Sequence, residues 1–185
     1  QHARSNQSLG FSLIGTYVRS LWVGSISSTL AMRRSLVLVM LPALRPLVPR
    51  WRIRADDCLV MGASLAGSQK YYLSEPTVPY RVHGRNHFHR QELDTAGDYA
   101  HWLRREALKV TFARELGIPG QVAHQADIEF QTIAWPTRHD YTEYVAIVWG
   151  LPLSLWARVK KRLKLHAHFK KTRLGQTRRP DELSR

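Results

Sequence analysis

The sequence feature that most constrains the fold is an apolar repeat between Asp98 and Leu116. Apolar side chains recur there every three or four residues, with arginine and glutamate between them. This spacing places the apolar side chains on one face of an α-helix. Gly117 and Pro119 follow at once and favour the end of a helix. The repeat therefore predicts an amphipathic helix over 98–116 that packs against the rest of the chain.

Shorter elements are predicted on both sides of this helix. A further helix is expected to start near Asp140 and to end at the Gly150-Leu151-Pro152 break. Upstream, the sequence predicts a strand or loop over 9–23, a helix from Ser35 that Pro42 stops, and a helix that begins at Asp56 or Asp57 and ends near Gly67. Extended segments are expected over 71–73 and 78–82.

Length and composition favour one folded unit with an anionic partner. The chain has 185 residues, of which 44% are hydrophobic, and its formal net charge is +14. Such a charge indicates nucleic acid, anionic lipid or phosphorylated substrates as partners. Cys58 is the only cysteine, which excludes an internal disulfide and is compatible with a reducing compartment. Arginines interrupt the apolar region over 9–48, so we predict no transmembrane helix, and residues 1–7 do not resemble a signal peptide.

The last part of the chain is strongly basic. Residues 144–180 contain no aspartate or glutamate, whereas lysines and arginines are frequent. Leu155, Trp156, Val159 and Leu163 share one helical face, and most cations lie elsewhere on the helix. This pattern is typical of a helix that lies on an anionic membrane surface. We therefore expect the 153–171 segment to contact such a surface, with nucleic acid the less favoured partner, and disorder after about Lys171.

The candidates for chemistry lie between Arg54 and Asn86. Asp56 and Asp57 form a carboxylate pair that either supplies a general base or caps the helix that follows. Arg81 and His83 alternate along an extended segment, so both point to one face, where they either bind a diphosphate with its metal or end a surface strand. His83, His87 and His89 only weakly suggest zinc. The chain contains no Gly-x-Gly-x-x-Gly, Gly-Lys-Ser/Thr or Gly-x-Ser-x-Gly motif.

A series of short motifs resembles the C-terminal half of a family 2 glycosyltransferase domain of the GT-A fold. In order, the motifs are Trp22-x-Gly24-x-x-Ser27-Ser28, Met32-Arg33-Arg34, Leu41-Pro42, Ala55-Asp56-Asp57 and the run from Tyr71-Tyr72-Leu73 through Arg81-Val82-His83-Gly84 to Asn86. The resemblance covers residues 10–90 closely and continues more loosely to about residue 165. It implies an α/β fold: a partial GT-A domain over 1–90, a helical extension over 91–150, and a basic helix with a disordered tail over 151–185.

The resemblance also implies an activity. Members of this family transfer a sugar from a nucleotide-diphospho-sugar donor to an acceptor hydroxyl with inversion, usually with a divalent metal such as Mg or Mn. The acceptor here would be a glycan or a lipid-linked molecule. We expect a cytoplasmic protein, peripheral at the inner face of the membrane through its basic tail. By position, Asp57 would be the catalytic base and Asp56 its acidic neighbour. Arg81 would face the donor diphosphate and His83 the metal, while the donor and acceptor cleft would be lined by Trp22, Ser27, Ser28 and Arg34.

The chain departs from the family at one motif. The nucleotide-binding half and its Asp-x-Asp motif would precede residue 1, and no Asp-x-Asp occurs in the sequence. Asp127-Ile128-Glu129 is the nearest match, but it follows the aspartate pair instead of preceding it. We therefore expect a fragment that does not catalyse transfer without the missing half. The alternative from the composition is a non-catalytic basic protein that binds anionic membrane or nucleic acid.

Overall fold

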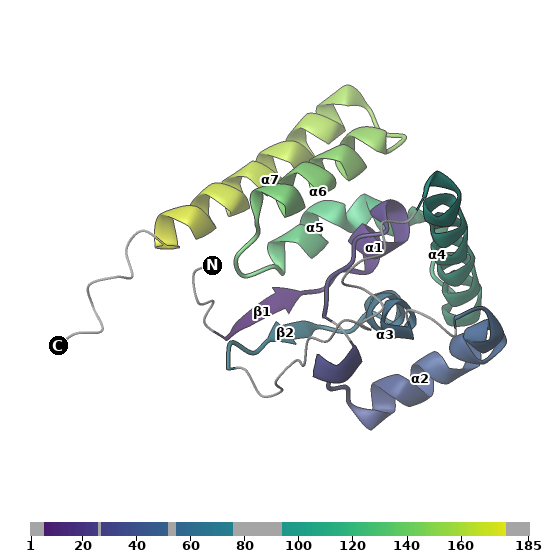
Figure 1. The fold of residues 1–185 in the computed structure, drawn as a ribbon. Helices are drawn as coiled ribbons and strands as arrows, with labels where there is room; N and C mark the ends of the chain where they lie inside the picture. The colour runs from purple at the N-terminus through teal and green to yellow at the C-terminus, as the bar shows by residue number, and fades with distance from the viewer. Residues whose placement is uncertain (1–5, 26, 52–54, 76–93, 177–185) are drawn as a thin grey trace.

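Helices dominate the computed structural model, which describes residues 6–25, 27–51, 55–75 and 94–176 (Figure 1). Its elements, in chain order, are β1 (Gln7–Gly10), α1 (Leu13–Arg19), the 3-10 helix η1 (Ser27–Thr29), α2 (Arg34–Leu44), the 3-10 helix η2 (Arg45–Arg50), α3 (Ala55–Leu65), β2 (Lys70–Tyr72), α4 (Thr95–Leu116), the 3-10 helix η3 (Gly120–Gln125), α5 (Ala126–Gln131), α6 (Arg138–Gly150) and α7 (Leu155–Gln176).

The apolar repeat forms the predicted helix as α4. The helix begins three residues earlier than predicted, because the side chain of Asp94 accepts a hydrogen bond from the Gly97 N–H at 2.8 Å and caps the first turn. Gly117 ends the helix with a φ of 63°, a left-handed conformation that glycine adopts without strain. The second predicted helix is also confirmed as α6, which begins with a capping box between Thr137 and Asp140.

The prediction was wrong in two places before residue 50. Residues 13–19 form α1 instead of continuing a strand or loop, and the carboxylate of Glu129 accepts hydrogen bonds from the first N–H groups of this helix. Pro42 does not stop α2, which continues to Leu44. Proline removes the hydrogen bond to the carbonyl four residues earlier, and here that residue is Leu38, on the exposed side of α2, where water can solvate the carbonyl.

The helix predicted after the aspartate pair is confirmed as α3. It ends as expected near Gly67, where the Ser68 N–H bonds the Ala63 carbonyl and the Gly67 N–H bonds the Ser64 carbonyl, and φ at Gly67 is 67°. These two bonds form the Schellman motif, which satisfies the last carbonyls of a helix. Asp57 lies in the first turn and points toward α4, so it does not act as the helix cap that the sequence suggested.

The strand content is limited to one small sheet in the described ranges. β1 and β2 are antiparallel, with Gln7 opposite Tyr72 and Ser8 opposite Tyr71, and an irregularity separates Ser8 from Gly10. The α/β prediction therefore holds in the coarse sense that helices accompany a sheet, and the described part of the chain is mostly helical. The GT-A topology stays a prediction. The expected strand over 78–82 lies outside the described residues.

Two apolar clusters hold the helices together. One is built from α2, η2, α3 and α4 and the other from α1, α5, α6 and α7, which form the upper group in Figure 1. Because α4 packs with α2 and α3, and α1 packs with α5 and α6, the segments 1–90, 91–150 and 151–185 share cores. The helix of the basic segment runs through Gln176, past the predicted onset of disorder at Lys171, and residues 177–185 lie outside the described part.

Gly62 sits where α3 meets α2 and α4, and we expect Gly62→Ala to destabilise the fold. An added Cβ would lie 2.7 Å from Phe112 Cζ and 2.8 Å from Met40 Cε, both in the core. Overpacking of this kind costs about 1–3 kcal/mol. Urea denaturation measures the change in the free energy of unfolding. Gly120→Ala is the matched control, because nothing lies within 4 Å of its added Cβ. Equal stability of the two variants would contradict the close packing.

Candidate functional site

Asp57, the predicted catalytic base, is buried in an ionic cluster between α3 and α4. Its side chain is 6% exposed, Arg105 Nη2 lies 3.1 Å from Oδ1, and His101 Nε2 lies 3.2 Å from Oδ2. Arg105 and His101 are four residues apart on α4, so they share one face of that helix. A buried carboxylate with such partners is stabilised by them, and removing one partner is costly. In this geometry Asp57 joins α3 to α4, and a substrate hydroxyl would reach it only if α4 moved.

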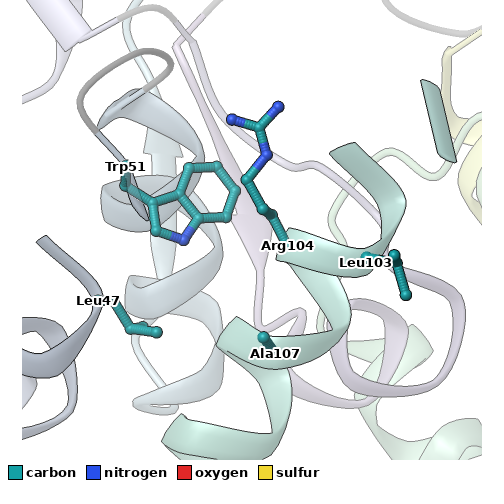
Figure 2. Close-up of a pocket in the computed structure, with 5 residues that line it drawn as sticks. All are labelled: Leu47, Trp51, Leu103, Arg104 and Ala107. Carbon is teal, nitrogen blue, oxygen red and sulfur yellow. The ribbon is translucent and has the colours of Figure 1, made fainter. Parts of the chain in front are cut away.

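A small cavity borders this cluster through Trp51. The Trp51 and His101 rings meet edge to face with centroids 6.1 Å apart, and the Arg104 guanidinium carbon lies 5.9 Å from the centre of the Trp51 ring. Figure 2 shows the Arg104 side chain beside the Trp51 ring, with Leu47 and Ala107 below them in this view. The volume is about 120 Å³. That is well below the roughly 300 Å³ of a typical small-molecule site, so the cavity does not extend the cluster into a substrate pocket.

Cys58, beside the aspartate pair, is not a reactive nucleophile. Burial raises the pKa of the Cys58 thiol to about 12, with further contributions from Asp57 and then Asp56. The thiolate is the nucleophilic form of cysteine, and a raised pKa keeps the thiol protonated near neutral pH. The residue acts as a small apolar side chain in the core, as its position in α3 suggested.

The other predicted site residues lie apart from the Asp57 cluster or outside the described residues. Asp56 is half-buried in the first turn of α3. Trp22 is 37% exposed in the segment before η1, where Gly24 approaches Val60 of α3. Ser27 and Ser28 belong to η1, and Arg34 is exposed at the start of α2. Arg81 and His83 lie outside the described residues, so their predicted diphosphate and metal contacts stay predictions.

The described residues supply no group of three or more histidine, cysteine, aspartate or glutamate side chains that could hold a metal ion. The divalent metal that the resemblance implies stays a prediction, because His83, its expected ligand, lies outside the described residues. The glycosyltransferase activity, with its nucleotide-diphospho-sugar donor, stays a prediction from the sequence.

Sequence reasoning missed two buried carboxylates that organise the second group of helices. Glu129 accepts hydrogen bonds from the N–H groups of Ile14 and Gly15 and from the Tyr144 hydroxyl. Burial, and then the nearby Glu129 carboxylate, raise the pKa of Tyr144. Asp127 contacts Lys161 and Lys164 of α7. The only local signal in the sequence is Asp127-Ile128-Glu129 itself, the nearest match to an Asp-x-Asp motif.

The Asp127 contacts fix which side of α7 faces the protein. Leu165 is fully buried, Phe169 packs beside it in the second cluster, and Lys161 also donates to the His124 carbonyl at 2.7 Å. At about 100° per residue, Leu163 lies roughly 200° around the helix from Leu165, and Trp156 lies roughly 180° from it. Leu163 is 61% exposed and Trp156 is 72% exposed. One side of α7 therefore packs on the core and the opposite side faces away from it.

We call this opposite side the α7 outer face. Its members are exposed and lie on the side of the helix away from Leu165: Trp156, Lys160, Leu163, Ala167, Lys170, Lys171 and Leu174. Arg162, Lys164 and Arg173 are exposed around it, and no acidic residue occurs in α7. The face thus combines an apolar stripe with flanking cations on a helix that is already folded against the protein.

Comparisons with known proteins give no relative: no family model, no curated protein and no solved structure matches the chain. No helix in the described ranges has the length and apolar character needed to cross a membrane.

Proposed function

We propose that this protein binds anionic membrane surfaces through the α7 outer face. The observation that carries the proposal is the exposure of Trp156 and Leu163, at 72% and 61%, on a helical side that is flanked by lysines. The free energy falls when exposed apolar side chains enter the headgroup region of a bilayer, and flanking cations attract anionic headgroups. The formal net charge of +14 acts in the same direction over longer distances.

The apolar stripe favours a membrane over nucleic acid as the partner. Binding to the phosphates of nucleic acid needs only the cations, and its affinity falls steeply as the salt concentration rises. Contacts with phosphates bury neither Leu163 nor Ala167, whereas insertion of α7 into a lipid interface buries both. An aromatic side chain such as Trp156 suits both partners, because it stacks on bases and also prefers the membrane interface. Leu163 is therefore the residue that separates the two partners.

Sedimentation of the full chain with lipid vesicles tests the proposal. We expect binding to vesicles that contain phosphatidylserine, weaker binding to neutral phosphatidylcholine vesicles, and loss of binding at high salt. Leu163→Gln should weaken binding by about tenfold or more, since full burial of a leucine contributes about 1.5–3 kcal/mol. Lys170→Gln with Lys171→Gln should also weaken it by about tenfold or more, at about 1 kcal/mol for each lysine.

Val110→Gln is the matched control, because Val110 is an exposed apolar residue on α4, 67% exposed, outside the outer face. It should leave vesicle binding unchanged. The proposal would be contradicted if Leu163→Gln left vesicle binding unchanged, or if Val110→Gln weakened it equally. Salt-sensitive binding to duplex DNA without any binding to anionic vesicles would overturn it in favour of nucleic acid.

A further inference from the structure

A groove separate from the α7 outer face lies where α1 and α6 end beside η3. Its volume is about 680 Å³. Small-molecule sites in proteins usually span about 300–1,000 Å³, so this groove is large enough for a ligand, unlike the cavity beside Trp51. It involves the C-terminal turns of α1 and α6, the N-terminal part of η3, and the segment that leads from α6 into α7.

Most of the groove lining is apolar. The apolar residues come from all of these segments: Val18, Ala123, Ala146, Ile147, Leu151 and Pro152. Gly120 and Gly150 also line the groove, and a lining dominated by apolar side chains suits an apolar ligand. The chemistry of the lining thus indicates a ligand with an apolar part, such as a hydrocarbon chain.

The polar side chains that line the groove can all donate hydrogen bonds. They are Arg19, Gln121 and His124. Arg19 Nε donates to Glu143 at 2.7 Å, and 46% of the Arg19 side chain is exposed. The terminal nitrogens of its guanidinium have no partner among the described residues, and they suit a carboxylate. Two helix C-termini also end here, and their dipoles disfavour an anion unless a cation offsets them. Arg19 is the cation in that position.

We propose that this groove binds a single-chain amphiphile with a carboxylate head, such as a fatty acid. The hydrocarbon chain lies along Ala146, Ile147 and Leu151, and the carboxylate pairs with Arg19. Ligand binding in this groove does not depend on vesicle binding by α7, so each proposal can be tested without the other. A protein with both sites would hold a membrane surface with one helix face and a single-chain lipid in a groove beside the start of that helix.

Calorimetric titration of the full chain with decanoate, below its micelle concentration and without vesicles, tests the site. We expect saturable binding of one decanoate per chain. Ala146→Phe should weaken it about tenfold or more by filling the groove, whereas Ala100→Phe, at an exposed position on α4, should not. Arg19→Gln should weaken decanoate about tenfold or more, the effect expected for loss of one charge-assisted hydrogen-bonded pair, and should leave 1-decanol unaffected.

Glu143→Gln is the matched control for Arg19→Gln, because it removes the carboxylate partner and keeps the guanidinium. Decanoate binding should be kept or strengthened in this variant. The site is overturned if decanoate shows no saturable binding, or if Ala146→Phe and Ala100→Phe behave alike. The role of Arg19 is overturned if decanoate and decanol respond equally to Arg19→Gln. Vesicle sedimentation of Ala146→Phe should match the unaltered chain, which keeps a failure here distinct from a failure of the α7 proposal.

Discussion

Replacing Glu129 with alanine should lower the free energy of unfolding by about 3–5 kcal/mol, because it leaves buried donors without an acceptor. Glu129 is 7% exposed and accepts hydrogen bonds from Ile14 N at 2.8 Å, Gly15 N at 3.0 Å and the Tyr144 hydroxyl at 2.6 Å. Two of these donors belong to the first turn of α1, where no intrahelical acceptor exists. The carboxylate also meets the positive end of the α1 dipole.

Thermal and urea denaturation followed by circular dichroism measure this loss. Tyr144→Phe removes one of the three donors and should cost only about 0.5–3 kcal/mol. Since both residues share one hydrogen bond, the double variant should be less destabilised than the sum of the two single changes. A Glu129→Ala variant within about 0.5 kcal/mol of the unaltered chain, the range of ordinary surface substitutions, would show that this carboxylate does not organise the start of α1.

The stability of the chain should rise with pH between about 7 and 10.5 through Lys70. Lys70 Nζ contacts the carbonyl oxygens of Val23 and Val60 and the hydroxyl of Ser64, at 2.6, 2.9 and 2.6 Å. These acceptors favour the ammonium, but burial outweighs them and lowers the pKa of Lys70 from 10.5 to about 7. Between these values the unfolded chain holds a proton that the folded chain has lost. Stability therefore increases with pH across this window, and the penalty for burying the charge is fully present below pH 7.

Comparison of the unaltered chain with Lys70→Met isolates this contribution from other titrating groups. The difference in the free energy of unfolding between the two proteins should shift by about 2–5 kcal/mol in favour of the unaltered chain from neutral pH to pH 10.5, at about 1.4 kcal/mol for each unit of pKa change. Lys160→Met, at an exposed position on α7, should show no such shift. A pH-independent difference for Lys70→Met would mean that Lys70 stays charged in the fold.

Local patterns predicted α2, α3, α4, α6 and α7 but not α1 or α5, and contacts between residues distant in the sequence were not predicted. The repeat over 98–116 and the break at Gly150 gave α4 and α6, because helix periodicity and end signals are local. Helix α1 was missed because its N-terminal turn depends on Glu129, more than a hundred residues away in the chain. The partners of Asp57 were missed for the same reason, since Arg105 is 48 residues distant.

The candidate surface was only half predictable. The sequence indicated that Leu155, Trp156, Val159 and Leu163 lie on one side of a basic helix. Three of them are more than half exposed, whereas Val159 is partly buried. The sequence did not reveal that the same helix has a second apolar side at Leu165 and Phe169, or that Asp127 would select that side for the core. A helix with two apolar sides can pack in either orientation, and the buried carboxylate decides between them. No pattern within residues 155–176 contains that information.

The anchoring of α7 has a consequence for the energetics of surface binding. Many short basic segments are unfolded in water and become helical only on a bilayer, so part of their binding free energy offsets the loss of chain entropy. Here Leu165, Phe169 and the Lys161–Asp127 pair keep the helix formed before any encounter. Binding of α7 to a surface then requires no further loss of chain entropy for helix formation. If α7 binds a bilayer as proposed, modest contacts by a few apolar side chains and lysines suffice for reversible attachment, and detachment leaves the helix intact.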